Sequence, residues 1–143
     1  MNSRTRYFPP EISKDWLDVQ MLRSYPAHKS SQVGRELLER LTEEYLKFWR
    51  LVLSFPDKRV VATAPILAVQ RVHQSNRKEY FDDCMAYFNR FLSTEFCWKG
   101  RSDVTGTVDT VSAYRELYRA QPPEQWRDIV NEYNLGKPKL IIV

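Results

Sequence analysis

Cysteine and histidine are scarce in this sequence, and no long apolar run occurs. The 143 residues include two cysteines, Cys84 and Cys97, and two histidines. Two isolated thiols exclude the disulfide framework of a small secreted domain and favour a reducing compartment. No stretch approaches the roughly 18 apolar residues of a membrane span, and the first residues lack the apolar segment of a secretory signal. We therefore expect a cytoplasmic protein with no membrane partner.

The sequence also lacks the short motifs of common catalytic and cofactor sites. It contains no G-x-S-x-G, Walker loop, G-x-G-x-x-G or H-E-x-x-H. Zinc needs four nitrogen or sulfur ligands in structural sites and usually three protein ligands in catalytic ones. Near His73 the sequence offers only Asp82, Asp83 and Cys84, without a second histidine. We therefore predict no metal and no cofactor, which favours a protein that is not an enzyme.

Positive charge exceeds negative charge, with 22 Lys and Arg against 18 Asp and Glu and a net charge of +4. Such a balance is compatible with nucleic-acid binding, which requires many positive charges on one surface. The basic residues, however, are scattered from Arg4 to Lys139 and alternate with acidic ones. Nucleic-acid binding is therefore only the third of three functional hypotheses.

Aromatic residues, by contrast, are plentiful, with four Trp, eight Tyr and seven Phe. Their total of 13% exceeds what packing alone requires in a core of this size. They indicate either bulky packing between helices or an aromatic pocket or interaction surface. A chain of this length forms one domain, and residues 13–136 are predicted to form it.

Apolar residues recur at spacings of three and four over about six turns, which predicts a long helix from about Ser31 to Ser54. Ser30 or Ser31 would cap it, and Phe55-Pro56-Asp57 would end it. Glu43 and Glu44 precede Lys47 at helical spacing, which places them on the exposed face. The predicted buried stripe consists of Val33, Leu37, Leu38, Leu41, Tyr45, Trp49, Val52 and Leu53.

The other segments predict an all-α fold of about six helices in an orthogonal bundle. A short helix follows Ser13, a brief one spans 66–73, and Asn76 opens the next through a capping box. That helix is expected to direct Tyr80, Phe81, Cys84, Phe88, Phe91 and Leu92 inward. A polar loop over 93–104, a helix over 108–118 and a last helix from Pro122 follow.

Three segments are predicted to be extended. Residues 1–12 form an N-terminal arm because Pro9-Pro10 forbids helix there. Residues 58–64 form a connector or a minor strand, since several of them are β-branched. The apolar tail, 137–143, is strand-like. It is expected to pair with Val60-Val61 in a two-stranded ribbon or to dock on a partner.

His73 is the main candidate for a functional residue, because it lies four residues after Val69 and seven after Ile66. It therefore projects from the apolar face of its helix. It is either a core histidine bonded through both ring nitrogens or a ligand contact. Cys84, on a buried stripe, is expected to be an inert thiol, and Cys97 beside Trp98 the more reactive one.

As a site residue, His73 would be a general base or ligand contact that Asp83 orients. The predicted ligand-binding residues are Arg71, His73, Tyr80 and Cys84, and the catalytic candidates are His73, Asp83 and Tyr80. Arg71 would hold an anionic group through its guanidinium. It lies two residues before His73, about 200° around an ideal helix. Both can meet one ligand only if that helix is short or distorted.

The order of several residues over about 35–127 resembles the glycine-rich domain-containing protein-like family. The family patterns are Y-x-x-F-L, then D-x-x-W-H-x-H, then P-x-x-Y-x-x-D-C, and later T…Y before P-x-x-x-W. The residues that carry the likeness are Tyr45, Phe48, Trp49, His73, Tyr80, Asp83, Cys84, Thr110, Tyr114, Tyr118, Pro122, Pro123 and Trp126. The resemblance implies a helical fold.

The sequence departs from the family pattern around His73. Leu67 stands where the family has Asp, Gln70-Arg71 replaces Trp-His, and Arg77 replaces Pro. If the family's cluster binds a metal or polar ligand, this chain has lost two of its members. No glycine-rich domain is present, since the chain has four glycines. The cluster around His73 thus resembles the remnant of a polar site.

The first functional hypothesis is a helical protein–protein interaction or accessory module without catalysis of its own. It follows from the missing catalytic motifs, the aromatic surplus and the apolar tail, and self-association is one form of it. The alternative is a small enzyme or ligand-binding protein with a polar pocket around His73. The partner is expected to be another protein or a second copy of the chain.

Overall fold

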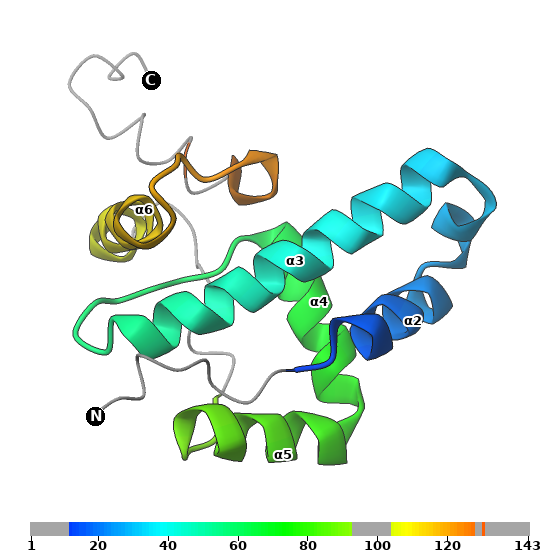
Figure 1. The fold of residues 1–143 in the computed structure, drawn as a ribbon, viewed down its shortest axis with the longest axis horizontal. Coiled ribbons are helices and arrows are strands. Elements are labelled where there is room, and N and C mark those ends of the chain that lie inside the picture. The colour runs from blue at the N-terminus through cyan, green and yellow to red at the C-terminus, as the bar shows by residue number, and fades with distance from the viewer. Residues whose placement is uncertain (1–11, 93–103, 128–129, 131–143) are drawn as a thin grey trace.

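All regular elements of the described chain are helical. The structure, a computed structural model, describes residues 12–92, 104–127 and 130 (Figure 1). Within those ranges no β-strand forms, which confirms the predicted all-α class. The α-helices are α2 (Lys14–Ser24), α3 (Gln32–Ser54), α4 (Ala64–Ser75), α5 (Arg77–Phe88) and α6 (Val104–Tyr118), and the 3₁₀ turns are η1 (Pro26–Ser30) and η3 (Glu124–Trp126).

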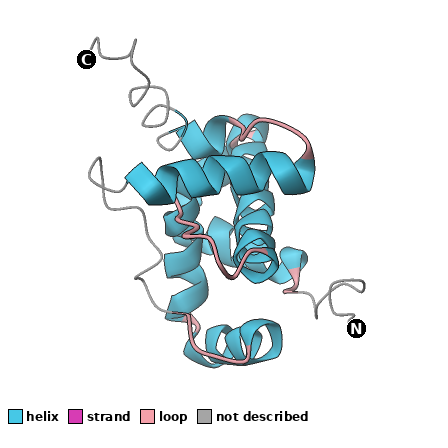
Figure 2. Ribbon diagram, turned by 90° about the vertical axis from the view of Figure 1, so that its left-hand side faces the viewer, coloured by secondary structure: helices cyan, strands magenta, loops and turns pink. Residues whose placement is uncertain are grey.

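The long helix α3 is the centre of the arrangement. It contacts α2, η1, α4 and α6, and in Figure 1 it runs diagonally between α2 and α6 while α4 crosses it steeply. Helix α5 packs on α4 at the edge of the molecule. Segments far apart in the chain therefore meet along α3, as Figure 2 shows from the side. The fold thus packs the other helices α2, α4 and α6 around α3.

Serine side chains begin two of these helices, as the sequence predicted. The Ser13 Oγ accepts a hydrogen bond from the backbone N–H of Trp16 at 3.1 Å. At α3 the sequence left two candidates open, and the structure selects Ser31, whose Oγ accepts from the N–H of Gly34 at 3.0 Å. Each serine satisfies a backbone donor that the first helical turn leaves unpaired.

Replacing Ser31 by alanine is expected to lower the free energy of unfolding by about 1 kcal/mol, because α3 loses its N-terminal cap. Urea denaturation measures the change. Ser30→Ala is the matched control, since the exposed Ser30 hydroxyl donates only to the carbonyl of Ala27. Its effect should stay within about 0.5 kcal/mol. Equal losses in the two variants would contradict the cap assignment.

The buried surface of α3 is wider than the predicted stripe. Phe48 and Leu51, which the stripe omits, are fully buried. The prediction was wrong for Val33, which is 75% exposed. A helix that packs on several neighbours buries more than one face, whereas a single amphipathic stripe describes a surface helix.

Two expectations about α5 were also wrong. Asn76 precedes the helix but makes no side-chain cap, because its amide donates to the carbonyl of Val72 at 3.1 Å. Tyr80, Cys84 and Leu92 are buried as predicted, but Phe81 and Phe91 are exposed. Helix α5 has one covered side, so only part of its apolar surface reaches the core.

The segment between α3 and α4 is held by side chains of α6. The backbone N–H of Arg59 donates to the Asp109 carboxylate, and that of Val61 donates to the Thr110 hydroxyl, both at 2.9 Å. The hydroxyl of Thr63 donates to the carbonyl of Gln125 at 2.8 Å. Side chains thus satisfy backbone groups that a strand would satisfy with a partner strand.

Several predicted features lie outside the described residues. These are the arm up to residue 11, most of the polar loop with Cys97, the last helix after Arg127 apart from residue 130, and the tail over 137–143. The two-stranded ribbon therefore stays a prediction. Of the helices in the described ranges, none combines the length and the apolar character needed to cross a membrane.

Candidate functional site

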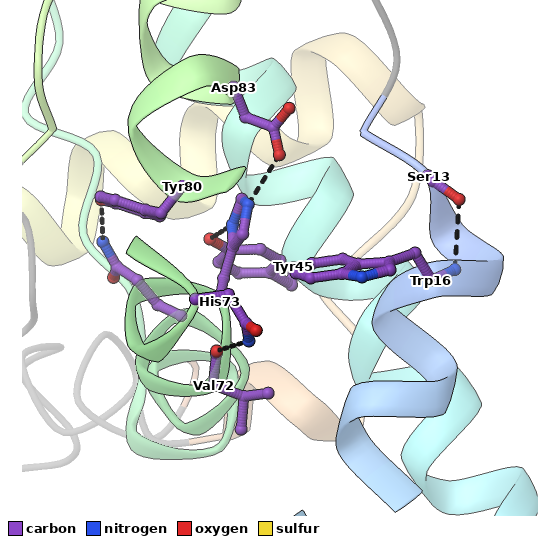
Figure 3. Close-up of polar contacts among 9 residues, drawn as sticks. Ser13, Trp16, Tyr45, Val72, His73, Tyr80 and Asp83 are labelled. Carbon is purple, nitrogen blue, oxygen red and sulfur yellow. Dashed lines mark hydrogen bonds and ion pairs between the residues drawn. The ribbon is translucent and has the colours of Figure 1, made fainter. Parts of the chain in front are cut away.

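Four helices meet around His73, which is fully buried. Helix α4 carries the imidazole, α3 contributes Tyr45 and Trp49, and α5 contributes Tyr80 and Asp83. Trp16 of α2 closes the remaining side (Figure 3). His73 faces inward because it continues the buried line of Ile66 and Val69 at helical spacing.

Both ring nitrogens of His73 have hydrogen-bond partners. The Tyr45 hydroxyl lies 2.7 Å from Nδ1, and the Asp83 carboxylate lies 2.8 Å from Nε2. Figure 3 shows the imidazole between these two groups. The Asp83 side chain is 28% exposed, so this end of the cluster reaches the surface while the Tyr45 end does not. The arrangement is the doubly bonded core histidine that was the first of the two interpretations.

Aromatic rings enclose the same imidazole. The ring of Tyr80 is 4.9 Å away in an edge-to-face contact, and that of Trp49 is 5.3 Å away. The rings of Tyr45 and Trp16 lie at 5.7 and 6.0 Å. Such contacts stabilise the ring by dispersion and by edge-to-face attraction. They also fill the space that a ligand of His73 would need.

The protonated Tyr45 hydroxyl is compatible with one consistent pattern of hydrogen-bond donors in the cluster. Burial raises the pKa of the Tyr45 hydroxyl well above its ordinary value, so this hydroxyl stays protonated at neutral pH. Tyr45 can then donate to Nδ1, while a proton on Nε2 is donated to the Asp83 carboxylate. In this tautomer every donor of the cluster has an acceptor: the Tyr45 hydroxyl has Nδ1, and Nε2–H has the Asp83 carboxylate.

Tyr80 and Cys84, the other two buried candidates, are engaged within the core. The Tyr80 hydroxyl donates to the carbonyl of Leu92 and lies 3.2 Å from the amide nitrogen of Gln70. Burial raises the pKa of Tyr80 to about 12. Burial likewise raises the pKa of the Cys84 thiol, which keeps it in the unreactive protonated form. Neither side chain offers a free group to a ligand.

Arg71 does not join these residues. It is exposed on α4, whereas His73 is on the buried side of the same helix. Helix α4 continues from Ala64 to Ser75, so it has neither the shortness nor the break that would let both residues contact one ligand. The structure thus brings together His73, Tyr80, Asp83 and Cys84 and leaves Arg71 apart.

The part of the chain that the structure describes contains no candidate metal site. No three His, Cys, Asp or Glu side chains in it are placed to hold one ion. At His73 itself both nitrogens already contact Tyr45 and Asp83. A metal would have to displace one of these two partners.

A second buried network lies around Glu44, the residue directly before Tyr45. Its Oε1 accepts hydrogen bonds from the Tyr114 hydroxyl at 2.9 Å and from Trp126 Nε1 at 2.8 Å. Its Oε2 is 3.2 Å from Lys47 Nζ. Glu44 is only 7% exposed, so the prediction that it lies on the solvent face of α3 was wrong. This carboxylate ties α3 to α6 and η3.

The sequence contains a weak signal for Glu44 that the predicted stripe passes over. Glu44, Phe48 and Leu51 follow one another at spacings of four and three, and all three are buried. This line runs beside the predicted one on α3. A polar residue within such a line is a candidate for a buried carboxylate with partners.

Two pockets on the described surface lie away from His73. One of about 320 Å³ is lined by Ile12, Lys14, Leu46, Lys47, Arg50, Tyr87 and Tyr118. The other, about 160 Å³, lies around Phe55 and Phe88. His73 lines neither pocket. Open space near polar side chains therefore occurs at these two pockets and not at the sequence-predicted site.

Comparison of the chain with protein-family models, with curated proteins and with solved structures finds no match. The resemblance to the glycine-rich domain-containing protein-like family therefore stays a prediction. Five of the thirteen residues that carry it belong to the hydrogen bonds of the two buried networks. Tyr45, His73 and Asp83 form the first, and Tyr114 and Trp126 belong to the second.

Proposed function

We propose that the protein is a helical interaction module without catalysis of its own, and that it binds a second copy of itself through α5. The observation that carries this proposal is an apolar pair on the outer side of α5. Phe81 is 51% exposed and Met85 is 38% exposed. They lie four residues apart, so their side chains are neighbours on the helix surface.

The pair differs from the other exposed apolar residues of the described chain. Val19, Val33 and Val108 are small and lie on three different helices, and Phe91, which is 55% exposed, follows the end of α5 instead of lying on it. Apolar residues scattered singly are normal at a surface, whereas grouped large ones mark interaction sites. The adjacent side of α5 covers α4 with Tyr80 and Cys84, whereas Phe81 and Met85 stay largely outside the core.

The partner that best fits the exposed surface of α5 is the α5 helix of a second copy of the chain. In a two-fold symmetric contact, one residue meets a second residue of the partner and the reverse contact is equivalent. Phe81 and Met85 lie symmetrically about Asp83, near the middle of the 12-residue helix. An antiparallel pair of α5 helices would therefore place each phenyl ring on a thioether, which is a favourable contact. The neighbouring Lys78 and Asp82 pair with each other at 2.7 Å, which limits charge repulsion.

Phe81→Glu is expected to raise the dissociation constant of the dimer by at least about tenfold, because it places a charge in the apolar contact. Sedimentation or light scattering over a range of protein concentrations measures it. Val33→Glu, at an exposed valine on α3, is the matched control and should dimerise like the wild type. A wild-type chain that stays monomeric over the whole range would overturn self-association, as would a Phe81→Glu chain that dimerises normally.

The alternative of a small enzyme or ligand-binding protein built on His73 gains no support from the geometry. A general base needs access to the proton it removes, but the imidazole is enclosed and bonded at both nitrogens. The cluster is better explained as the polar centre of the helix packing. Its role in the interaction module is to hold α5 on α3 and α4, which keeps Phe81 and Met85 outside.

A further inference from the structure

The two methionines in the described ranges differ sharply in their access to solvent. Met85 is 38% exposed on α5, which lies at the edge of the molecule (Figure 1), whereas Met21 of α2 is fully buried. Peroxides oxidise a methionine thioether to the sulfoxide, and they reach an exposed sulfur more readily than a buried one. The single chain therefore presents Met85 to an oxidant and protects Met21.

Oxidation at this position changes the surface of α5 and leaves the helix itself in place. The backbone carbonyl of Met85 accepts the N–H of Asn89 at 3.0 Å, which closes the end of the helix. This bond involves main-chain atoms only. The neighbouring Cys84, and not Met85, is the side chain that reaches the core. An oxygen added to the Met85 sulfur therefore lies on the outer side of α5, next to Phe81 one turn before it.

We propose that Met85 is a modification site, and that its oxidation to the sulfoxide abolishes the self-association of the chain. This inference rests on the α5 contact of the proposed function. In that contact each thioether lies on the Phe81 ring of the second copy, where water is excluded. A sulfoxide is polar and its oxygen accepts hydrogen bonds from water. Burying that oxygen against a phenyl ring leaves it without a donor, which disfavours the dimer.

Hydrogen peroxide is an oxidant of the class required. One of its oxygen atoms is transferred to a lone pair on the Met85 sulfur while the O–O bond breaks, and the other oxygen leaves as water with both hydrogens. The sulfur loses two electrons and the peroxide gains them. Methionine sulfoxide reductases reverse the change, so the modification is suited to a switch and is more than a lesion.

Oxidation and self-association exclude each other at Met85. The dimer covers the thioether, so peroxide reacts with the free chain, and the oxidised chain does not return to the dimer. A two-fold contact contains the Met85–Phe81 pair twice, so one oxidised copy already disturbs it. By mass action, dilution increases the share of free chain. It should therefore accelerate oxidation of Met85 and leave that of Met21 unchanged.

Peroxide treatment of the full chain tests the proposal, with the oxidised residues assigned by mass spectrometry of peptides. Below the dissociation constant of the dimer we expect Met85 to react at least about tenfold faster than Met21. Above it, the rate at Met85 should fall. Sedimentation of the chain oxidised at Met85 should give a dissociation constant at least about tenfold higher. Treatment with a methionine sulfoxide reductase should restore the original value.

Met85→Leu is the matched control, because leucine has a similar volume but no sulfur. Met1 and Met21 remain in this variant. It should dimerise within about threefold of the wild type and keep that affinity after peroxide treatment. If peroxide dissociated its dimer as well, the sensitive residue would lie elsewhere. An unchanged circular dichroism spectrum and unfolding midpoint of the oxidised wild type would show that the contact, and not the fold, is lost.

Two results would overturn the inference while leaving the proposed dimer in place. The first is an unchanged dissociation constant in a wild-type chain fully oxidised at Met85. The second is a rate of oxidation at Met85 that is no faster than at Met21 or that does not depend on protein concentration. A chain that is monomeric before peroxide is added contradicts the proposed function itself, and the inference falls with it. The two failures are therefore distinguishable.

Discussion

Glu44→Ala is expected to lower the free energy of unfolding by about 3 kcal/mol, measured by urea denaturation. The substitution leaves the Tyr114 hydroxyl and the Trp126 indole N–H, which now bond Oε1 at 2.9 and 2.8 Å, without an acceptor in the core. Hydrogen bonds to a charged group contribute about 1.5–3 kcal/mol each. The Lys47 side chain is 39% exposed, so water compensates part of the lost ion pair.

Glu43 provides the control for this prediction, because it is the preceding residue on α3 but is exposed. Glu43→Ala should change the free energy of unfolding by no more than about 0.5 kcal/mol. Glu44→Gln keeps an acceptor oxygen but loses the charge, and we expect a loss of about half that of the alanine variant. Equal stabilities of the Glu43 and Glu44 alanine variants would show that the buried network contributes nothing.

The two residues illustrate what local sequence patterns can and cannot reveal. Glu43 and Glu44 both precede Lys47 at helical spacing, and the sequence alone assigns them to the same exposed face. The partners that separate them, Tyr114 and Trp126, lie 70 and 82 residues further along the chain. Burial of Glu44 depends on where α6 and η3 dock. That docking is a tertiary property, and α3 itself gives only the weak signal of the line Glu44, Phe48 and Leu51.

The helices could be predicted more fully than the buried network, because the sequence signals that define them are local. Ser13 begins α2 and Phe55 follows the last residue of α3 as predicted. The inward direction of His73 follows from its spacing to Ile66 and Val69 and is confirmed by its burial. The prediction that Phe81 points inward was wrong because it depended on tertiary packing. Its spacing fits an apolar line on α5, but no helix covers that line in the described chain.

His73 separates the two interpretations that the sequence left open. A ligand-binding histidine can be replaced with little loss of stability, whereas a core histidine cannot. His73→Ala is expected to cost about 3–5 kcal/mol in the free energy of unfolding, because it opens a cavity among four rings and removes both hydrogen bonds. Arg71→Ala, on the exposed side of the same helix, should change it by no more than about 0.5 kcal/mol. Similar unfolding midpoints for the two variants would contradict the core interpretation.

Two further variants separate packing from hydrogen bonding in this cluster. His73→Leu nearly restores the volume but leaves the Tyr45 hydroxyl without an acceptor, so we expect a loss of about 2–3 kcal/mol. The loss of the hydrogen bond to Asp83 costs less, because the Asp83 side chain is 28% exposed and water can replace its lost partner. Adding Tyr45→Phe to His73→Leu removes the orphaned hydroxyl and should recover about 1 kcal/mol, although Tyr45→Phe alone destabilises the wild type. This reversal of sign requires direct coupling of Tyr45 to His73, since two independent core residues would give additive losses.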